Sequence, residues 1–306
     1  MVNGVSNEPG HRLNVTCRPA RESDTTDVLE ITHHIWDGED YVPHVWKEWL
    51  ADKIGLLAVA EHQGRVLGLS KLTQLAPGNW WMEGLRVHPQ YEGRGIASQL
   101  HDYLLDYWGG HGSGAIRLAT SAERISVHHL CERTGFNRVG EVLFFKADAL
   151  GDTDSSFRAI GQGDIPEAID MIEGNPALEF NYGLMDLGWQ WTSPDKTLIE
   201  RTVKGGQAFW WGAQDSAKKG LVMYWLDDWE NSEHPRKPIP MIELFICQPA
   251  EWQVFFQDFR RLAAEKGFDH AGWLVPMFPD LEQAILTAGF QREWEGSLYI
   301  FAKEIY

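Results

Sequence analysis

The chain of 306 residues has few cysteines, few basic residues and no long apolar run. Its three cysteines, Cys17, Cys131 and Cys247, fit neither a metal site nor a disulfide framework, which favours a reducing cytosol. Only 27 lysines and arginines stand against 44 acidic residues, and the net charge of −17 argues against nucleic acid as a partner. Because no stretch has the length of a membrane span or the pattern of a leader, we expect a cytoplasmic protein without a membrane partner.

What the chain does have is enough apolar material for more than one core. Hydrophobic residues make up 43% of it, and the length exceeds that of one typical domain, so we expect two. Residues Met1–Gly10 are polar and are expected to form a loose start. The tryptophans of the second half are expected in core or interdomain packing: Trp189, Trp191, Trp210, Trp211, Trp225 and Trp229.

The stretch Trp80–Ser98, WWMEGLRVHPQYEGRGIAS, is the most informative part of the sequence. It begins as a buried strand, and Pro89 ends the strand because proline has no N–H to donate. A glycine turn follows, and a helical pattern starts at Ile96. A strand, a glycine turn and a helix N-terminus present unpaired N–H groups, so the stretch predicts a phosphate site.

The pattern around this stretch predicts a mixed α/β domain with the order β-α-α-β-β-β-α-β-α-β around one sheet. After a polar, acidic segment at 147–156, parts of the pattern recur. Arg18 and Asp24 before a helix recur as Arg158 and Asp164, and Gly135-Phe136 before a strand recurs as Gly289-Phe290. Where the second glycine turn should fall, the chain reads CQPAEW from Cys247, without glycine. We therefore expect the chain to contain the same fold twice, and we expect the second copy to lack the phosphate site.

At these residues the sequence resembles the GNAT superfamily of acetyl-CoA-dependent N-acetyltransferases. The resemblance rests on V-x-P at the strand end, on the glycine turn, and on the helix and Gly-Phe of CERTGF before the closing strand. The family signature R/Q-x-x-G-x-G/A is assigned to the turn that starts at Glu92. In this alignment Glu92 replaces the usual Arg or Gln, so the side-chain contribution to pyrophosphate binding is weaker.

The resemblance implies two GNAT-like domains in tandem. The first is an acetyl-CoA-binding domain at 1–147, and a linker at 148–156 joins it to a degenerate domain at 157–306 that lacks the pyrophosphate loop. The backbone of Leu85, Arg86 and Val87 would pair with the pantetheine arm, where a bulge splays the strand. The residues that would hold the pyrophosphate are Gly93, Arg94, Gly95, Ile96, Ala97 and Ser98.

A narrower resemblance, to the histidine N-acetyltransferase-like branch, lies in IWDGEDYVP at 35–43 and in Glu83-Gly84-Leu85-Arg86-Val87. That branch acetylates the α-amine of an amino acid and also has a second, degenerate half. In this fold the turn between the first two helices lines the acceptor pocket, so Asp40 would pair with a cationic substrate and Tyr41 would orient it. Turn chemistry alone is the other interpretation, because tight turns also favour Asp and Gly.

Acetyl transfer needs a neutral amine, and therefore a base, and also an acid for the departing thiolate. Glu83 is the candidate base or ammonium contact, since apolar neighbours on its strand would raise its pKa; a purely structural ion pair is the other interpretation. The family's usual acid is a Tyr on the helix before Gly-Phe. Counting back from Gly135, Cys131 stands there, and either it or His128 or His129 would act, although a buried Cys more often only packs.

The sequence thus predicts an N-acetyltransferase that uses acetyl-CoA and a small primary amine, as a monomer or homodimer. No metal is expected, because the adjacent His33 and His34 lack a third ligand at suitable spacing. Two alternatives stay open. The chain is an acetyl-CoA-binding or sensing module without turnover, or it acetylates protein lysines or N-termini, for which an open acceptor groove would be needed.

Overall fold

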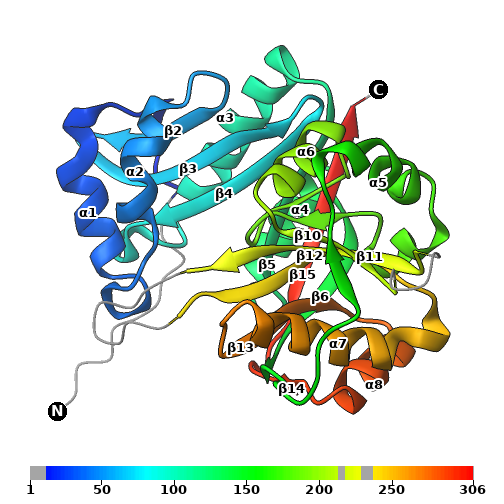
Figure 1. Cartoon of the computed structure of the whole chain (residues 1–306). Helices are drawn as coiled ribbons and strands as arrows, with labels where there is room; N and C mark the ends of the chain where they lie inside the picture. Colours follow the sequence, from blue (N-terminus) through cyan, green and yellow to red (C-terminus); the bar gives the residue numbers. More distant parts are fainter. Residues whose placement is uncertain (1–11, 213–217, 229–236, 306) are drawn as a thin grey trace, which may run out of the picture. The chain divides into compact units, whose positions relative to one another are not determined.

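A computed structural model describes residues 12–212, 218–228 and 237–305, which form two compact units. Unit 1 comprises Met1–Ile116 and Lys303–Tyr306, and unit 2 comprises Arg117–Ala302 (Figure 1). The predicted loose start at Met1–Gly10 and Trp229 lie outside the described residues.

The strands of unit 1 pair antiparallel in the order β1-β2-β3-β4. They are β1 (Thr16–Pro19), β2 (Leu56–His62), β3 (Arg65–Ala76), β4 (Asn79–Val87) and the beginning of β5 (Gly114–Ser121), which continues into unit 2. The β2–β3 hairpin turns through Gln63 and Gly64, with φ of 51° and 80°. Two consecutive positive φ angles match the right-handed twist of the strands, as the sequence HQGR predicts.

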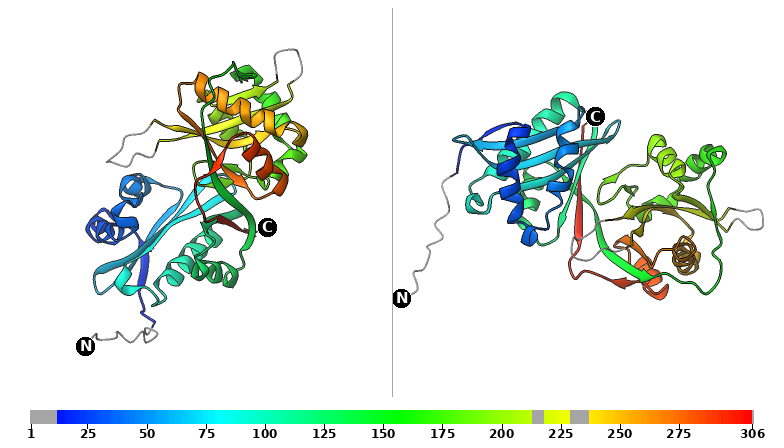
Figure 2. Two further views of the ribbon diagram at one scale, coloured as in Figure 1. Left: turned by 90° about the horizontal axis from the view of Figure 1, so that it is seen from below. Right: turned by 60° about the vertical axis from the view of Figure 1, so that its left-hand side comes forward.

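The helices of unit 1 cover both faces of this sheet (Figures 1 and 2). They are α1 (Thr25–His33), α2 (Val42–Ala51) and α3 (Ile96–His111), with short 3-10 turns η1 (Glu22–Asp24), η2 (Trp36–Gly38) and η3 (Pro89–Tyr91). Apolar side chains of α1 and α2 pack with Leu57, Val59 and Leu69 in one core. The other face meets α3, because a Cβ at Gly68 would lie 3.2–3.3 Å from Leu100 and Ile96.

Unit 2 has a sheet in the order β15-β6-β13-β12-β11-β10-β7, with β14 also paired to β6. The strands are β6 (Asn137–Asp148), β7 (Phe157–Ala159), β10 (Ala208–Trp211), β11 (Gly220–Asp227), β12 (Ile239–Ile246), β13 (His270–Pro276), β14 (Gln291–Arg292) and β15 (Leu298–Ile305). A separate ribbon is formed by β8 (Met185–Asp186) and β9 (Trp191–Thr192). The pair β12–β13 is parallel.

The helices of unit 2 are α4 (Ile125–Arg133), α5 (Ile165–Ile172), α6 (Lys196–Lys204), α7 (Trp252–Glu265) and α8 (Pro279–Thr287). Its 3-10 turns are η4 (Gln162–Asp164), η5 (Pro176–Asn181) and η7 (Pro249–Glu251). The large core lies between the strands and α7–α8, and Phe255, Phe256 and Phe259 on α7 are fully buried there. Helices α5 and α6 contact each other, and α6 contacts β11.

The recurring sequence features have matching geometry in the two halves. The carboxylates of Asp24 and Asp164 each accept a backbone N–H three residues earlier, at the start of a 3-10 turn. Gly135 and Gly289 have φ of 81° and 92° and end α4 and α8. After each glycine a phenylalanine N–H bonds back to the helix, at 3.0 and 3.1 Å. These local features agree with the predicted repeat of one fold.

The compact units divide the chain at a different place from the predicted domains. Strand β6 falls within the predicted first domain, yet its partners are β13, β14 and β15 of unit 2. The segment predicted as a linker lies against α7, where Asp152 pairs with Arg261 at 2.8 Å and Ser155 bonds to Glu265. The boundaries at 147 and 157 remain predictions about the repeat.

Candidate active site

The glycine turn has the geometry of an anion cradle. Gly93 and Gly95 have φ of 73° and 75°, which side chains disfavour, and Gly95 is the N-cap residue of α3. In the described part of the chain, no acceptor is found for the backbone N–H groups from Gly93 to Ser98. These donors point from the positive end of a helix of 16 residues, an arrangement that binds phosphate.

A residue that sequence reasoning missed, Arg12, lies over this turn. Its Cγ, Cδ and Nε lie 3.4–3.8 Å from the position of a Cβ on Gly95. The segment is held by the N–H of Leu13, which donates to the Arg94 carbonyl at 3.0 Å, and by Gln99 Nε2, which donates to the Leu13 carbonyl at 2.8 Å. Because these contacts join residues more than 80 positions apart, no local pattern could predict them.

The alignment of the signature at Glu92 needs a correction. The pattern has two residues between its Arg or Gln and its first glycine, so counting back from Gly93 places Gln90 at that position. Gln90 lies in η3, directly before the turn. The motif therefore has its usual residue, and the supposed loss of side-chain help at Glu92 does not arise.

Strand β4 contains the predicted bulge. Leu69 pairs with Arg86, and two residues later Lys71 pairs with Glu83, so β4 has one residue more than β3 between the two pairs. Gly84 lies in the bulge with φ of 63°, and a Cβ there would lie 2.5 Å from the Trp49 ring. The glycine thus lets α2 approach the strand.

Glu83 lies beside this bulge, and its Oε1 accepts a hydrogen bond of 2.7 Å from the Thr73 hydroxyl. Lys71 is opposite in register, but its buried ammonium bonds to Asp52 and to the Leu72 carbonyl. The Glu83 charge acts on Tyr41, whose pKa is raised first by burial and then by this carboxylate. Glu83 and Tyr41, two of the predicted site residues, are therefore close together.

Asp40 is also in this cluster, but in a role that the sequence did not predict. Its buried carboxylate receives two hydrogen bonds from Arg86, at 2.8 and 3.0 Å, and one from the Val42 N–H at 3.2 Å. The Arg86 guanidinium lies over the ring of Trp36, 4.7 Å from its centroid. Asp40 thus fastens the turn before α2 to β4, and its charge is balanced by Arg86.

Comparisons with known proteins agree with this geometry. The model of the acetyltransferase (GNAT) family matches residues 23–136, which include the cluster and the glycine turn. Residues 23–136 are a GNAT acetyltransferase domain.

The matched curated relatives include a histidine N-acetyltransferase from Xenopus tropicalis, 32% identical over 87 residues. That match covers 28% of this chain and 27% of the relative, so the chain spans about a quarter of that protein's length. Among solved structures, a GCN5-related N-acetyltransferase from Sphaerobacter thermophilus has a TM-score of 0.62 and 13% identity, with 95% of each chain covered.

A tandem GNAT protein from the clavulanic acid biosynthesis pathway has a TM-score of 0.56 at 12% identity and covers 95% of this chain and 98% of its own. These likenesses show the fold. The predicted fold class, an α/β chain with two GNAT-like halves in tandem, is confirmed.

The candidate acid Cys131 lies on α4, within the matched residues and in unit 2, and its role stays a prediction. The side chain is 0% exposed, and burial raises the pKa of the thiol to about 12. A thiol that holds its proton so firmly is a poor donor to another thiolate. Cys131 is a core residue.

We expect Cys131→Ala to keep the rate of acetyl transfer within about twofold, because the removed thiol takes no part in proton transfer. The measurement is steady-state thiol release at saturating acetyl-CoA, with thermal unfolding as a check on folding. A loss of more than tenfold in kcat with an unchanged unfolding temperature would restore the acid role.

The two histidines of α4 differ in their surroundings. His128 is largely buried, its Nε2 lies 3.1 Å from the Ser121 carbonyl, and its ring stacks on Tyr299 at 5.2 Å. His129 is exposed. Neither arrangement assigns an acid, so their role stays a prediction.

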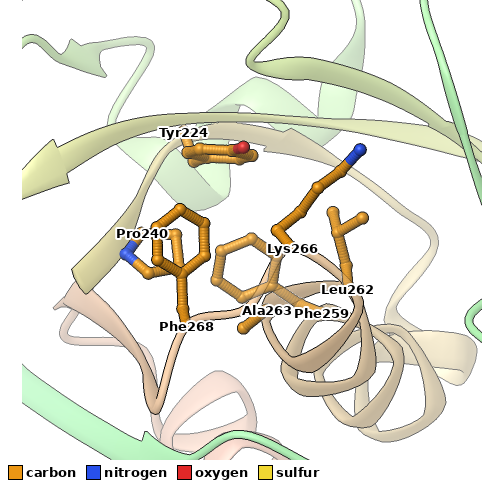
Figure 3. A pocket seen from close by; sticks show the side chains of 7 residues that line it. All are labelled: Tyr224, Pro240, Phe259, Leu262, Ala263, Lys266 and Phe268. Carbon is orange, nitrogen blue, oxygen red and sulfur yellow. The ribbon is translucent and has the colours of Figure 1, made fainter. Parts of the chain in front are cut away.

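Other features of the described residues do not add a metal or membrane role. In unit 2, Figure 3 shows Tyr224, Phe259 and Phe268 around an apolar crevice, which has no volume that a water-sized group can enter. Among the described residues, no three His, Cys, Asp or Glu side chains are grouped as metal ligands would be. None of the described helices is both long and apolar enough to cross a membrane.

Proposed function

We propose that the chain transfers an acetyl group from acetyl-CoA directly to the primary amine of a small molecule, with free amino acids as the expected acceptors. The observation that supports this most is the set of N–H groups from Gly93 to Ser98, for which the described residues supply no acceptor, next to a bulged strand that carries a carboxylate. A diphosphate needs such donors, and an amine needs such a carboxylate.

The residues of the turn fit acetyl-CoA. The N–H groups of Gly93–Ser98 would hold the pyrophosphate, and the side chain of Arg12 would add a positive charge there. The backbone of Leu85, Arg86 and Val87, at and after the bulge, would pair with the pantetheine arm. When bound, acetyl-CoA supplies a thioester whose carbonyl an amine can attack.

In this proposal Glu83 takes the proton of the acceptor's ammonium group, directly or through one water. The Thr73 hydroxyl donates to its Oε1 and so fixes the orientation of the carboxylate. Lys71 is held by Asp52, so it does not bind the carboxylate in place of a substrate. The Asp40 carboxylate fixes the side chain of Arg86 and the turn that contains Tyr41. Its effect on the reaction is therefore indirect.

A panel of acceptors tests the substrate class. The full chain, with acetyl-CoA, is given free amino acids including histidine, their Nα-acetyl derivatives, and lysine-containing peptides with blocked N-termini. We expect acetylation of free α-amines, with little on the other two groups. Preference for the peptides would instead support a protein acetyltransferase.

Arg12→Ala should weaken CoA binding about three- to tenfold and reduce its salt dependence, because an exposed cation near a diphosphate contributes modestly. Affinity for acetylpantetheine, which lacks the diphosphate, should not change. Calorimetric titration with both ligands measures this.

The matched control for Arg12 is Lys53→Ala, which removes the same charge from an exposed position elsewhere in unit 1. Equal weakening by both variants, or equal loss of acetylpantetheine affinity, would contradict the assignment of Arg12 to the phosphate site.

A further inference from the structure

A buried histidine, His88, joins strand β4 to the glycine turn. It is 3% exposed, and its backbone is held on both sides. Its N–H donates to the Leu67 carbonyl at 2.9 Å, and its carbonyl accepts the Tyr91 N–H at 2.8 Å. Pro89 and Gln90 follow and begin η3, and Gln90 occupies the first position of the family signature. The direction in which the chain leaves the strand for the turn is therefore set at His88.

The imidazole of His88 caps η3. Its Nδ1 accepts the Gln90 N–H at 3.3 Å, so this nitrogen has a free lone pair and the proton of the neutral ring is on Nε2. The side chain of Gln90 is exposed, as a side chain that meets a ligand must be. The cap thus fixes the backbone of the residue that starts the signature.

Two other turns of this chain show what such a cap contributes. Asn175 precedes the proline of η5, and its φ and ψ of −70° and 125° are close to the −55° and 126° of His88. The Asn175 Oδ1 accepts the Ala177 N–H at 2.9 Å. Gln248 precedes the proline of η7, where the second half lacks the glycine turn, and no described side chain caps that turn. Asparagine is therefore a cap that fits this backbone and does not titrate.

The groups packed around the imidazole can accommodate a second proton on it. On α1, the Glu30 Oε1 lies 3.6 Å from Nε2, and the ring centroid of His34 lies 5.9 Å from that of His88. On β3, Arg65 pairs with Glu30, and on η3 the Tyr91 ring centroid lies 5.5 Å away. The pKa of Glu30 is lowered, first by the hydrogen bond from Arg65 and further by His88, so this carboxylate is ionised at neutral pH.

We propose that His88 is a positioning residue that couples the affinity of the glycine turn for a diphosphate to pH. A proton on Nδ1 makes that nitrogen a donor that faces the Gln90 N–H, which is also a donor, and the cap is lost. Ionised Glu30 balances part of the imidazolium charge, so the loss of the cap outweighs the added attraction for an anion. Imidazoles change charge between pH 5 and 8, and the turn binds more weakly at the acidic end of this range. The inference rests on the proposed function, which assigns CoA to this turn.

The first test is calorimetric titration of the full chain with CoA at pH 5.5 and pH 8, at constant ionic strength, in the wild type and in His88→Asn. The phosphate monoester of CoA also titrates near pH 6, and the variant, which keeps a cap, measures that ligand effect alone. We expect affinities within about twofold of each other at pH 8, and a wild-type affinity about five- to tenfold lower than that of His88→Asn at pH 5.5. His88→Leu, which fills the space without an acceptor, should bind weakly at both pH values.

The outcomes separate this inference from the proposed function. The same pH dependence in the wild type and His88→Asn would overturn the inference and leave CoA at the turn. Unchanged affinity in a folded His88→Leu would do the same. Acetylpantetheine, which lacks the diphosphate, should show no difference between the chains, and a difference as large as that for CoA would also overturn it. CoA binding by none of the chains at either pH would overturn both proposals.

A second measurement needs no ligand. In the full chain with ¹⁵N-labelled histidine, the imidazole resonances that are missing from His88→Asn belong to His88. We expect them to show a protonated Nε2 and an unprotonated Nδ1 at pH 8, because Nδ1 accepts the Gln90 N–H. A proton on Nδ1 at pH 8 would overturn the inference whatever the chain binds.

Discussion

Gly95→Val should abolish measurable CoA binding and, with it, turnover. The φ of Gly95 is 75°, a region that a β-branched residue occupies only under strain. Its Cβ would also lie 3.4 Å from the Arg12 side chain, and the added methyl groups would cover the N–H groups of the turn. Calorimetric titration with CoA measures the effect, which we expect to exceed about 100-fold, or roughly 2.7 kcal/mol.

Gly109→Ala is the control for this variant. Gly109 lies on the same helix, α3, at a position where a Cβ meets nothing within 4 Å. Alanine there should leave CoA affinity unchanged and stabilise the helix by about 0.5–1 kcal/mol. If Gly95→Val binds CoA as tightly as Gly109→Ala does, the phosphate site is not at this turn.

Glu83→Gln should lower kcat by about 10²- to 10⁴-fold, the usual contribution of a general base. The substitution keeps the shape and an oxygen for the Thr73 hydroxyl, so the loss would come from basicity. The acidic limb of the pH–rate profile should move from the pKa of the carboxylate to the higher pKa of the acceptor amine. The deficit should narrow as the pH rises toward the pKa of the acceptor amine, since more of the amine then arrives neutral.

Two controls accompany Glu83→Gln. CoA affinity should stay within about twofold of wild type, because the side chain is not assigned to the phosphate site. Thr73→Val, which removes the hydroxyl donor but leaves the carboxylate, should cost far less in kcat. An unchanged acidic limb in Glu83→Gln would show that another group takes the proton.

The parts of the site that the sequence predicted are those with local signals. One continuous stretch contains Pro89, the glycines of the turn and the helical period that starts at Ile96. The structure has the expected strand, turn and helix there. The bulge was expected only through the family resemblance, since it depends on how β3 and β4 pair.

The parts that were missed depend on residues far apart in the chain. The Asp40–Arg86 pair joins positions 46 apart, so no local pattern could indicate that Asp40 binds an arginine of the same chain. Counting along a helix placed Cys131 at the family's acid position, but only the packing around α4 shows that its thiol is fully buried. Strands β8 and β9 have two residues each, which is too short for an alternation of apolar and polar residues to predict a strand.

The central claim is that this chain transfers acetyl groups to amines rather than only binding acetyl-CoA. The most direct measurement is CoA release from acetyl-CoA by the full chain, with and without a free amino acid, followed by mass analysis of the amino acid. We predict sustained release that requires the amine and matches the N-acetyl product mole for mole. Tight binding of acetyl-CoA with no amine-dependent release across the panel would contradict the account and support a sensing module.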